Sequence, residues 1–286
     1  MKKTSATEME HWLENLNNGF TGGACHTPRF LKPYHLVTLA TELKRYAEKN
    51  INLPEALFAY VTRMKLWEAI DVAPPYDPEE ITSHAGFLPV EPLKSSDTVA
   101  TSAEALLALI KPHCSNPLTI ESLRCMLLEL LDNCFSHAAI DHSLHGIVCC
   151  QPWRNGNLAQ IALADSGIGI RSSLLENHDL KTRLKRENAC ELATEFGVTS
   201  KPQGRHSGYG LALTRELMEQ TGGNLLLISG SEVFQSCEGK SDSDYLETPW
   251  HGTLLVMEWN MDAALNVETI YQRWPLPKGL TAEDFD

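Results

Sequence analysis

Apolar positions recur every three to four residues in two stretches of the first third of the chain, residues 35–50 and 53–70. This spacing predicts two amphipathic helices, and Pro54 suits the first turn of the second one. The stretch DVAPPYDPEE that follows is rich in residues that break helices. We therefore expect a loop-rich connection over about residues 72–98, with a domain boundary near its end.

Helical and strand-like patterns alternate in the rest of the chain. Three helices are expected over about residues 101–110, 119–139 and 209–223, the first with a capping box from Thr101 to Glu104. The stretches HGIVCCQPW, LAQIALAD, NLLLIS and GTLLVMEW are typical of strands. Asn155-Gly156 between the first two is a hairpin signal. This order predicts an α/β sandwich, one sheet with helices packed on one face.

The helix expected over residues 119–139 carries a polar stripe beside its apolar one. Glu129, Asn133 and His137 follow one another at intervals of four residues and therefore share one edge of the helix. The apolar stripe comprises Leu123, Leu127, Leu130, Leu131, Cys134 and Ala138. Taken alone, such a polar stripe is more typical of a solvated helix flank than of a site. For His137, contact with phosphates or a lid and a simple surface role both stay open.

Two glycine-containing loops follow. DSGIGI begins at Asp165, where an apolar strand ends, and a buried carboxylate there is costly unless a partner meets it. GRHSGYGLAL begins at Gly204 and leads into the helix over residues 209–223. Glycines before a helix let backbone N–H groups approach a phosphate closely. The second loop lacks the Lys-Ser/Thr of a P-loop.

Taken in order, these stretches resemble the GHKL superfamily of histidine-kinase-like ATPases. ELLDNCFSHA is similar to its N box, DSGIGI to its first glycine box and GRHSGYGLAL to its second. Gly252-Thr253 resembles its terminal Gly-Thr element, and the resemblance covers about residues 98–262. It implies the Bergerat-type two-layer α/β sandwich, preceded here by a smaller, mainly helical or α/β region.

The resemblance also implies a role for each matching residue. Asp165 would accept a hydrogen bond from the adenine amine, with Thr253 fixing the same edge and Gly167 and Gly169 leaving room for the nucleoside. Asn133 would ligate Mg²⁺ between the ATP phosphates, and Glu129 would act as general base. Backbone N–H groups of Gly208, Tyr209, Gly210 and Leu211 would face the phosphates. The polar segment 171–207 would form a lid, with Lys201, Arg205 and His206 as candidate phosphate partners.

The residues before and after these motifs indicate which branch of the superfamily the chain resembles. None of the histidines before the motifs (His11, His26, His35, His84 and His113) is followed by the acidic residue usual beside a phosphoacceptor. The layout is similar to stand-alone anti-sigma-factor serine kinases, apart from the long N-terminal region and an insert over residues 231–250. We expect a partner or regulatory domain over residues 1–97, possibly STAS-like, an ATP-binding domain over 98–262 and a tail over 263–286.

Two functions stay open at this point: an ATP-dependent kinase or ATPase, and a nucleotide-gated switch that binds ATP without turnover.

The net charge of −13 disfavours nucleic acid and anionic membranes as partners. No stretch is apolar enough to span a bilayer or to act as a secretory signal, which predicts a cytoplasmic protein. The cysteines, none in a C-x-x-C pair, are expected to be free thiols. An unidentified protein partner and a homodimer are the further expectations.

Overall fold

The computed structural model of the chain describes residues 2–22, 25–45, 53–73, 87–114, 116–137, 145–202 and 208–275. Its α-helices are α1 (Ala6–Phe20), α2 (Pro33–Arg45), α3 (Glu55–Arg63), α4 (Leu66–Ala69), α5 (Val99–Ile110), α6 (Pro117–His137), α7 (Ile170–Leu174), α8 (Ala189–Ala193), α9 (Gly210–Gln220) and α10 (Val267–Tyr271). Its strands are β1 (Leu88–Leu93), β2 (Gly146–Trp153), β3 (Leu158–Ala164), β4 (Asn224–Cys237) and β5 (Lys240–Asn260).

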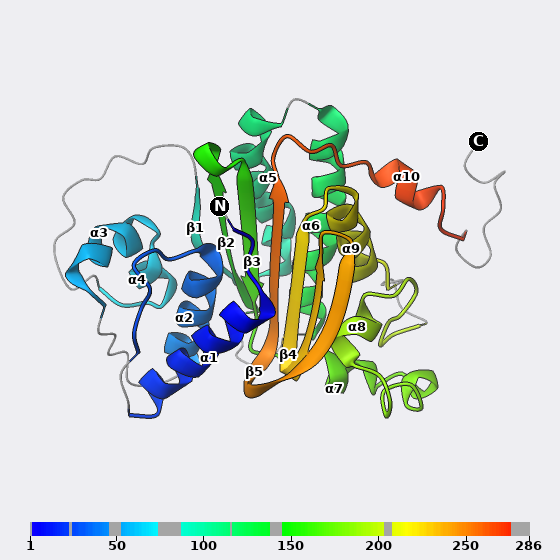
Figure 1. Cartoon of the computed structure of the whole chain (residues 1–286), viewed down its shortest axis with the longest axis horizontal. Coiled ribbons are helices and arrows are strands. Elements are labelled where there is room, and N and C mark those ends of the chain that lie inside the picture. The colour runs from blue at the N-terminus through cyan, green and yellow to red at the C-terminus, as the bar shows by residue number, and fades with distance from the viewer. Residues whose placement is uncertain are drawn as a thin grey trace.

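The strands form one sheet in the order β1-β2-β3-β5-β4, with every neighbouring pair antiparallel. Helices α5, α6 and α9 cover one face, as the two-layer fold predicts (Figure 1). Helices α1, α2 and α4 pack against the other face, seen to the left of the sheet in Figure 1. The expected α/β sandwich is confirmed, and the N-terminal helices form an additional layer on the second face, which was not expected.

The alternation of side chains along the strands explains how both faces are buried. Leu163 and Leu255 point into the core shared with α6 and α9, whereas their neighbours Ala162 and Leu254 belong to the core shared with α2. Every residue of β3 is buried, since neither of its faces meets water. The N-terminal helices are thus part of the packing that holds the central strands.

A buried polar cluster fastens the N-terminal segment to the sheet. Glu258 on β5 is fully buried, and its carboxylate accepts hydrogen bonds from the Thr4 backbone N–H at 2.6 Å and from the side-chain amides of Gln160 at 2.7 Å and Asn224 at 2.8 Å. The Thr4 hydroxyl also donates to it at 3.0 Å, and four donors around one carboxylate offset much of the cost of burying it. A domain boundary at residues 97 and 98 stays a prediction, but these contacts cross it.

Some elements differ from the expected ones. Helix α1 was not expected, although Met9, Trp12, Leu13 and Leu16 are buried along its inner side. The connection expected over residues 72–98 contains β1 at the sheet edge, and residues 74–86 lie outside the described part. The capping box at Thr101 is wrong because α5 begins at Val99, which places Thr101 within its first turn.

The insert over residues 231–250 extends the last two strands. It forms the distal half of the β4–β5 hairpin, which turns at Glu238 and Gly239, both with positive φ. Ser229 and Gly230 mark a shift in register between its two halves. The hairpin between β2 and β3 closes through a short 3₁₀ turn over Arg154–Gly156, with Asn157 in the left-handed region.

The described cysteines are all free thiols, four of them buried. Within the described residues, the helices are too short or too polar to cross a membrane.

Candidate functional site

Asp165 directly follows β3 and lines a pocket at the end of the sheet. Its backbone N–H donates to the Thr253 carbonyl at 2.9 Å. Its Oδ1 accepts from the backbone N–H groups of Gly167 at 2.7 Å and Thr253 at 3.1 Å. Burial raises the pKa of Asp165 to about 6, although these hydrogen bonds act in the opposite direction. An ionised carboxylate accepts more bonds than these two, so capacity remains for a donor from a ligand.

Gly252 brings β5 into close contact with Asp165. Its φ of +99° lies in the left-handed region, and a Cβ there would lie 2.3 Å from the Asp165 carbonyl oxygen and 2.6 Å from Oδ1. The Ser229 hydroxyl ties the neighbouring loop to the same place, since it donates to the Gly252 carbonyl at 2.7 Å and accepts from the Ile170 N–H at 2.8 Å. The DSGIGI loop and the Gly-Thr element therefore form one rigid corner.

Helix α6 places Glu129 and Asn133 on the opposite side of the same pocket. At Gly210, the first residue of α9, the backbone of α9 approaches α6 closely. A Cβ at position 210 would lie 3.0 Å from Glu129 Cβ and 3.4 Å from Asn133 Nδ2. The close approach of α6 and α9 thus brings a carboxylate and an amide to the N-terminal end of α9. Glu129 is exposed and Asn133 is half-buried, and both side chains line the pocket.

The second glycine box provides the third side of the pocket. Gly208, Tyr209, Gly210 and Leu211 all line it. Gly208 has a φ of +71°, and a Cβ there would lie 2.4 Å from the Val198 carbonyl oxygen, so only glycine fits against the preceding segment. Tyr209 precedes the first turn of α9, an 11-residue helix whose first residues, Gly210 and Leu211, line the pocket. A helix N-terminus of this kind favours an anion.

The segment expected as a lid is largely packed in place. Glu232 on β4 is almost fully buried and holds the Arg171 guanidinium through both carboxylate oxygens, at 2.5 and 2.6 Å. It also accepts from the Ala189 backbone N–H at 2.7 Å. Asn188 caps α8 and donates to the Val233 carbonyl on β4. Residues 170–200 are therefore fastened to the extended β4–β5 hairpin, and a lid that closes over its whole length does not agree with these contacts.

The candidate phosphate partners in this segment are only partly described. Lys201 is exposed, whereas Arg205 and His206 lie outside the described residues. His137 ends α6, and its side chain also lies outside the described part. Two acidic residues of the segment are paired, since Arg183 bridges Glu187 and Glu195.

Some pocket residues have no counterpart among the expected ones. Ser173, Thr199 and Ser200 line it from the lid segment. The Ser200 hydroxyl is buried without a hydrogen-bond partner among the described residues, which marks it as a candidate ligand contact. Single serines and threonines in a polar segment carry no periodic signal, so the sequence does not distinguish them. His35, one of the histidines before the motifs, lies outside the site, and burial together with nearby Lys32 lowers its pKa to about 3.

The donor set in this pocket suits Mg²⁺ only together with a ligand. In the described residues, no group of three or more His, Cys, Asp or Glu side chains is arranged to hold a metal. Asn133 supplies one hard amide oxygen at the N-terminal end of α9. Mg²⁺ typically takes one or two protein oxygens and completes its shell with phosphates and water. The residues present therefore fit a metal ion that arrives with a nucleotide.

Comparison with known proteins agrees with this geometry. Residues 119–248 match the family of histidine kinase-, DNA gyrase B-, and HSP90-like ATPases. The match begins in α6 and ends in β5, and so includes both glycine boxes. No curated protein matches the chain. The polar edge of α6, Asp165 and the glycine loop before α9 thus lie within the matched residues, whereas Gly252 and Thr253 follow them. Over the matched residues, the chain contains an ATP-binding domain of the GHKL superfamily.

Proposed function

We propose that the protein is a regulatory Mg-ATP-binding kinase or ATPase that acts in intracellular signalling. The observation that carries this proposal is the pairing of a buried acceptor, Asp165, with a carboxylate and an amide, Glu129 and Asn133, across one pocket. An acceptor without donors favours the amino group of adenine over the keto oxygen of guanine. The catalytic pair lies on the side where the N-terminal end of α9 would receive the phosphates.

Each residue has a distinct task in the proposed complex. Asp165 and Thr253 bind the adenine edge, and Gly167 and Gly169 give the nucleoside room. Backbone N–H groups from Gly208 to Leu211 bind the phosphates, to which the Ser200 hydroxyl is a further donor. Asn133 holds Mg²⁺, which when bound would neutralise phosphate charge.

Glu129 is the proposed general base. Its side chain is exposed to the pocket and is therefore accessible to a water molecule or an acceptor hydroxyl. The oxygen of that group attacks the γ-phosphorus, its proton passes to Glu129, and the bond from the γ-phosphorus to the bridging oxygen breaks to release ADP. Transfer to a serine or threonine of a partner protein gives a kinase of the anti-sigma-factor type, and transfer to water gives an ATPase.

The alternative is a switch that binds ATP without turnover. Fastening of the lid segment to the β4–β5 hairpin favours it, because a largely pre-packed pocket can hold a nucleotide without a closure step. In both cases we propose a cytoplasmic protein that works through a protein partner, with homodimer formation as one arrangement.

Calorimetry with Mg-ATP and Mg-GTP tests the common part of the proposal. The wild-type protein should bind Mg-ATP at least about tenfold more tightly than Mg-GTP. Asp165→Asn should lose most of this preference, since its amide presents a donor to the adenine amine. Asp179→Asn changes an exposed acid in the same region and should leave both affinities unchanged. Equal affinity for ATP and GTP in the wild-type protein would refute the assignment of Asp165.

A further inference from the structure

The chain beyond the region matched by the family packs back onto the site. Asn266 caps α10, and both its backbone N–H and its carbonyl bond to the Gln220 side chain at the end of α9. The backbone N–H groups of Leu265 and Val267 donate to the hydroxyls of Thr119 and Ser122 on α6. The stretch leading to residue 275 is therefore docked against the two helices that carry the N box and the second glycine box.

Three aromatic rings from separate parts of the chain meet at the end of this segment. Phe196 comes from the lid segment, Tyr209 from the glycine loop and Trp274 from the residues after α10. The rings of Phe196 and Tyr209 stack with centroids 4.7 Å apart and planes at 12°. The Trp274 ring lies 4.6 Å from Phe196 and 5.6 Å from Tyr209. Such separations are those of interacting aromatic pairs.

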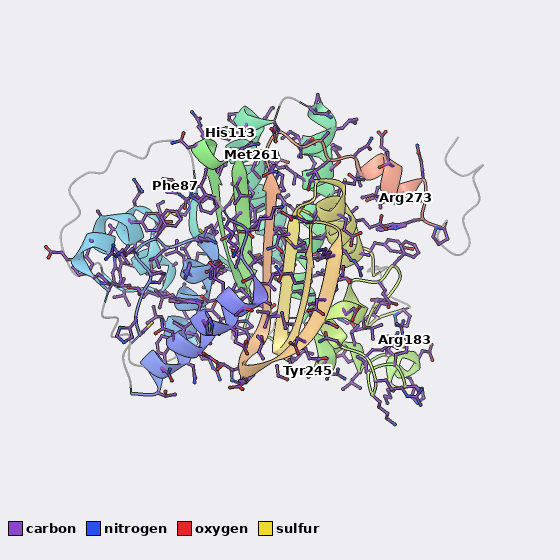
Figure 2. The ribbon with its side chains drawn as sticks, in the orientation of Figure 1. Phe87, His113, Arg183, Tyr245, Met261 and Arg273 are labelled. Carbon is purple, nitrogen blue, oxygen red and sulfur yellow. The ribbon has the colours of Figure 1, made fainter. Side chains whose placement is uncertain are left out.

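The position of Trp274 is itself fixed by Glu216 on α9. The indole N–H donates to Glu216 Oε1 at 2.8 Å, and the Arg273 guanidinium binds Oε2 at 2.5 Å. Figure 2 shows Arg273 and the lid residue Arg183 on the same side of the sheet. Trp274 is thus held from α9 while its ring rests on both the lid segment and the glycine loop.

Tyr209 carries the aromatic side chain of the described part of the glycine loop. It lies between Gly208 and Gly210, both of which line the pocket. Glycine on each side leaves the backbone of this short stretch with much conformational freedom. Loop N–H groups bind phosphates only if they already point the right way, since ordering them on binding costs affinity. A ring stack on Tyr209 removes that freedom before the nucleotide arrives.

We propose that Trp274 is a positioning residue for the nucleotide phosphates, acting through Tyr209 and Phe196. The C-terminal segment orders the glycine loop and joins it to the lid segment, so its docking sets the affinity for the phosphate end of ATP. The adenine end, at Asp165, is independent of it. This inference rests on the proposed function for its nucleotide readout, but the ordering of the loop does not depend on that readout.

The test compares full-length Trp274→Ala, Trp274→Phe and Glu268→Gln with the wild-type protein. Affinities for Mg-ATP and for adenosine are measured by calorimetry or ligand-observed NMR. Trp274→Ala should weaken Mg-ATP binding about tenfold and change adenosine binding less than about twofold. Trp274→Phe keeps a ring and should restore most of the Mg-ATP affinity. Glu268→Gln changes only an exposed side chain on α10 and should behave as wild type.

Hydrogen exchange of the free proteins provides a second measurement. Residues 196–202 and 208–211 should exchange faster in Trp274→Ala than in the wild-type protein, while β3 stays unchanged. An equal loss of ATP and adenosine affinity would reduce Trp274 to a general packing role and overturn the proposal. If the wild-type protein binds no ATP, the proposed function is refuted. The positioning role is tested separately by hydrogen exchange, and unchanged exchange around Tyr209 in Trp274→Ala would refute it.

Discussion

Asp165 and Gly252 meet so closely that position 252 has no room for a side chain: a Cβ there would lie 2.6 Å from Asp165 Oδ1. The first substitution to test is therefore Gly252→Ala. It should lower the free energy of unfolding by about 2–4 kcal/mol, from the clash and the unfavourable φ, and should abolish measurable ATP binding. Urea denaturation and calorimetry measure the two effects.

Gly239→Ala is the matched control for this substitution. Gly239 has a φ of +76° in the β4–β5 turn, and nothing lies within 4 Å of a Cβ built there. Alanine at 239 should therefore cost only about 1 kcal/mol, from backbone strain alone, and leave ATP affinity intact. Equal effects at 239 and 252 would show that close contact with Asp165 is not what requires glycine.

The raised pKa of Asp165 makes stability depend on pH. The pKa rises from its ordinary value of 3.8 to about 6 in the folded protein, because burial disfavours the charge. The folded state therefore holds its proton longer than the unfolded chain, and the contribution of Asp165 to stability is fully present below pH 4. It falls as the pH rises through about 6, by at most about 3 kcal/mol, and is constant above pH 7.

Asp165→Asn removes this titration and isolates its effect. Without nucleotide, the free energy of unfolding of the variant minus that of the wild-type protein should be larger at pH 7.5 than at pH 5. Chemical denaturation of both proteins at pH 5, 6 and 7.5 measures the difference. If the stability of both proteins depends on pH in the same way, the carboxyl of Asp165 does not have a raised pKa. In the wild-type protein, Mg-ATP binding near pH 6 should release a proton, which calorimetry in buffers of different ionisation enthalpy detects.

Glu129 and Asn133 lie one turn apart on α6, but their substitutions should affect different properties, turnover for Glu129 and Mg-ATP binding for Asn133. Asn133→Ala should weaken binding of Mg-ATP itself, whereas Glu129→Gln should retain binding. If the protein turns ATP over, Glu129→Gln should slow phosphate release or transfer by about 10²–10⁴-fold. The assay includes proteins that co-purify in the presence of Mg-ATP. Rates that are equally negligible in wild type and variant under every condition would favour the switch.

The anchor of the lid segment gives a further prediction. Glu232→Ala removes the buried partner of Arg171 and of the Ala189 N–H, and should lower the free energy of unfolding by about 2 kcal/mol. Hydrogen exchange should quicken over residues 170–200 in particular. Glu195→Ala breaks a more exposed pair with Arg183 in the same segment and should change stability by less than about 0.5 kcal/mol. Similar exchange in the two variants would mean that Glu232 does not anchor the segment.

The packing of the N-terminal helices bears on the expected domain boundary. A fragment that begins at residue 98 lacks β1 and exposes Ile147, Ala162 and Val256 on the second sheet face. We expect it to aggregate or to lack a cooperative unfolding transition, while the full chain unfolds cooperatively. Circular dichroism and light scattering compare the two. A soluble, cooperatively folding fragment would support the boundary at residues 97 and 98.

The residues of the pocket could be predicted from the sequence better than the packing around them. Glu129, Asn133 and Asp165 lie in contiguous motifs whose spacing encodes their position, and the structure brings them to one pocket. The coverage of the second sheet face was encoded more weakly. The stretch LAQIALA has almost no polar positions, which favours burial on both sides, but this does not say which helices provide the second layer.

Contacts between distant residues were beyond the reach of sequence patterns. Glu232 lies in a stretch that alternates polar and apolar residues, and nothing local says that it faces Arg171 rather than solvent. Trp274 likewise gives no signal of its stacking partners. Residues 203–207, with two of the expected phosphate partners, lie outside the described chain. Motif spacing indicated which residues line the pocket, whereas long-range packing determines how the surrounding segments are held.

The bond between Thr4 and Glu258 joins positions 254 residues apart. During translation, α1 emerges long before the strand that satisfies it, and its apolar side chains have no sheet to cover until β5 is complete. The central strands also depend on distant segments, because their two faces are buried only when the helices on both sides have formed. A protein with such contacts has a high contact order and should fold slowly, after β5 has been synthesised. Chaperone dependence of the newly made chain would then be a direct cost of its topology.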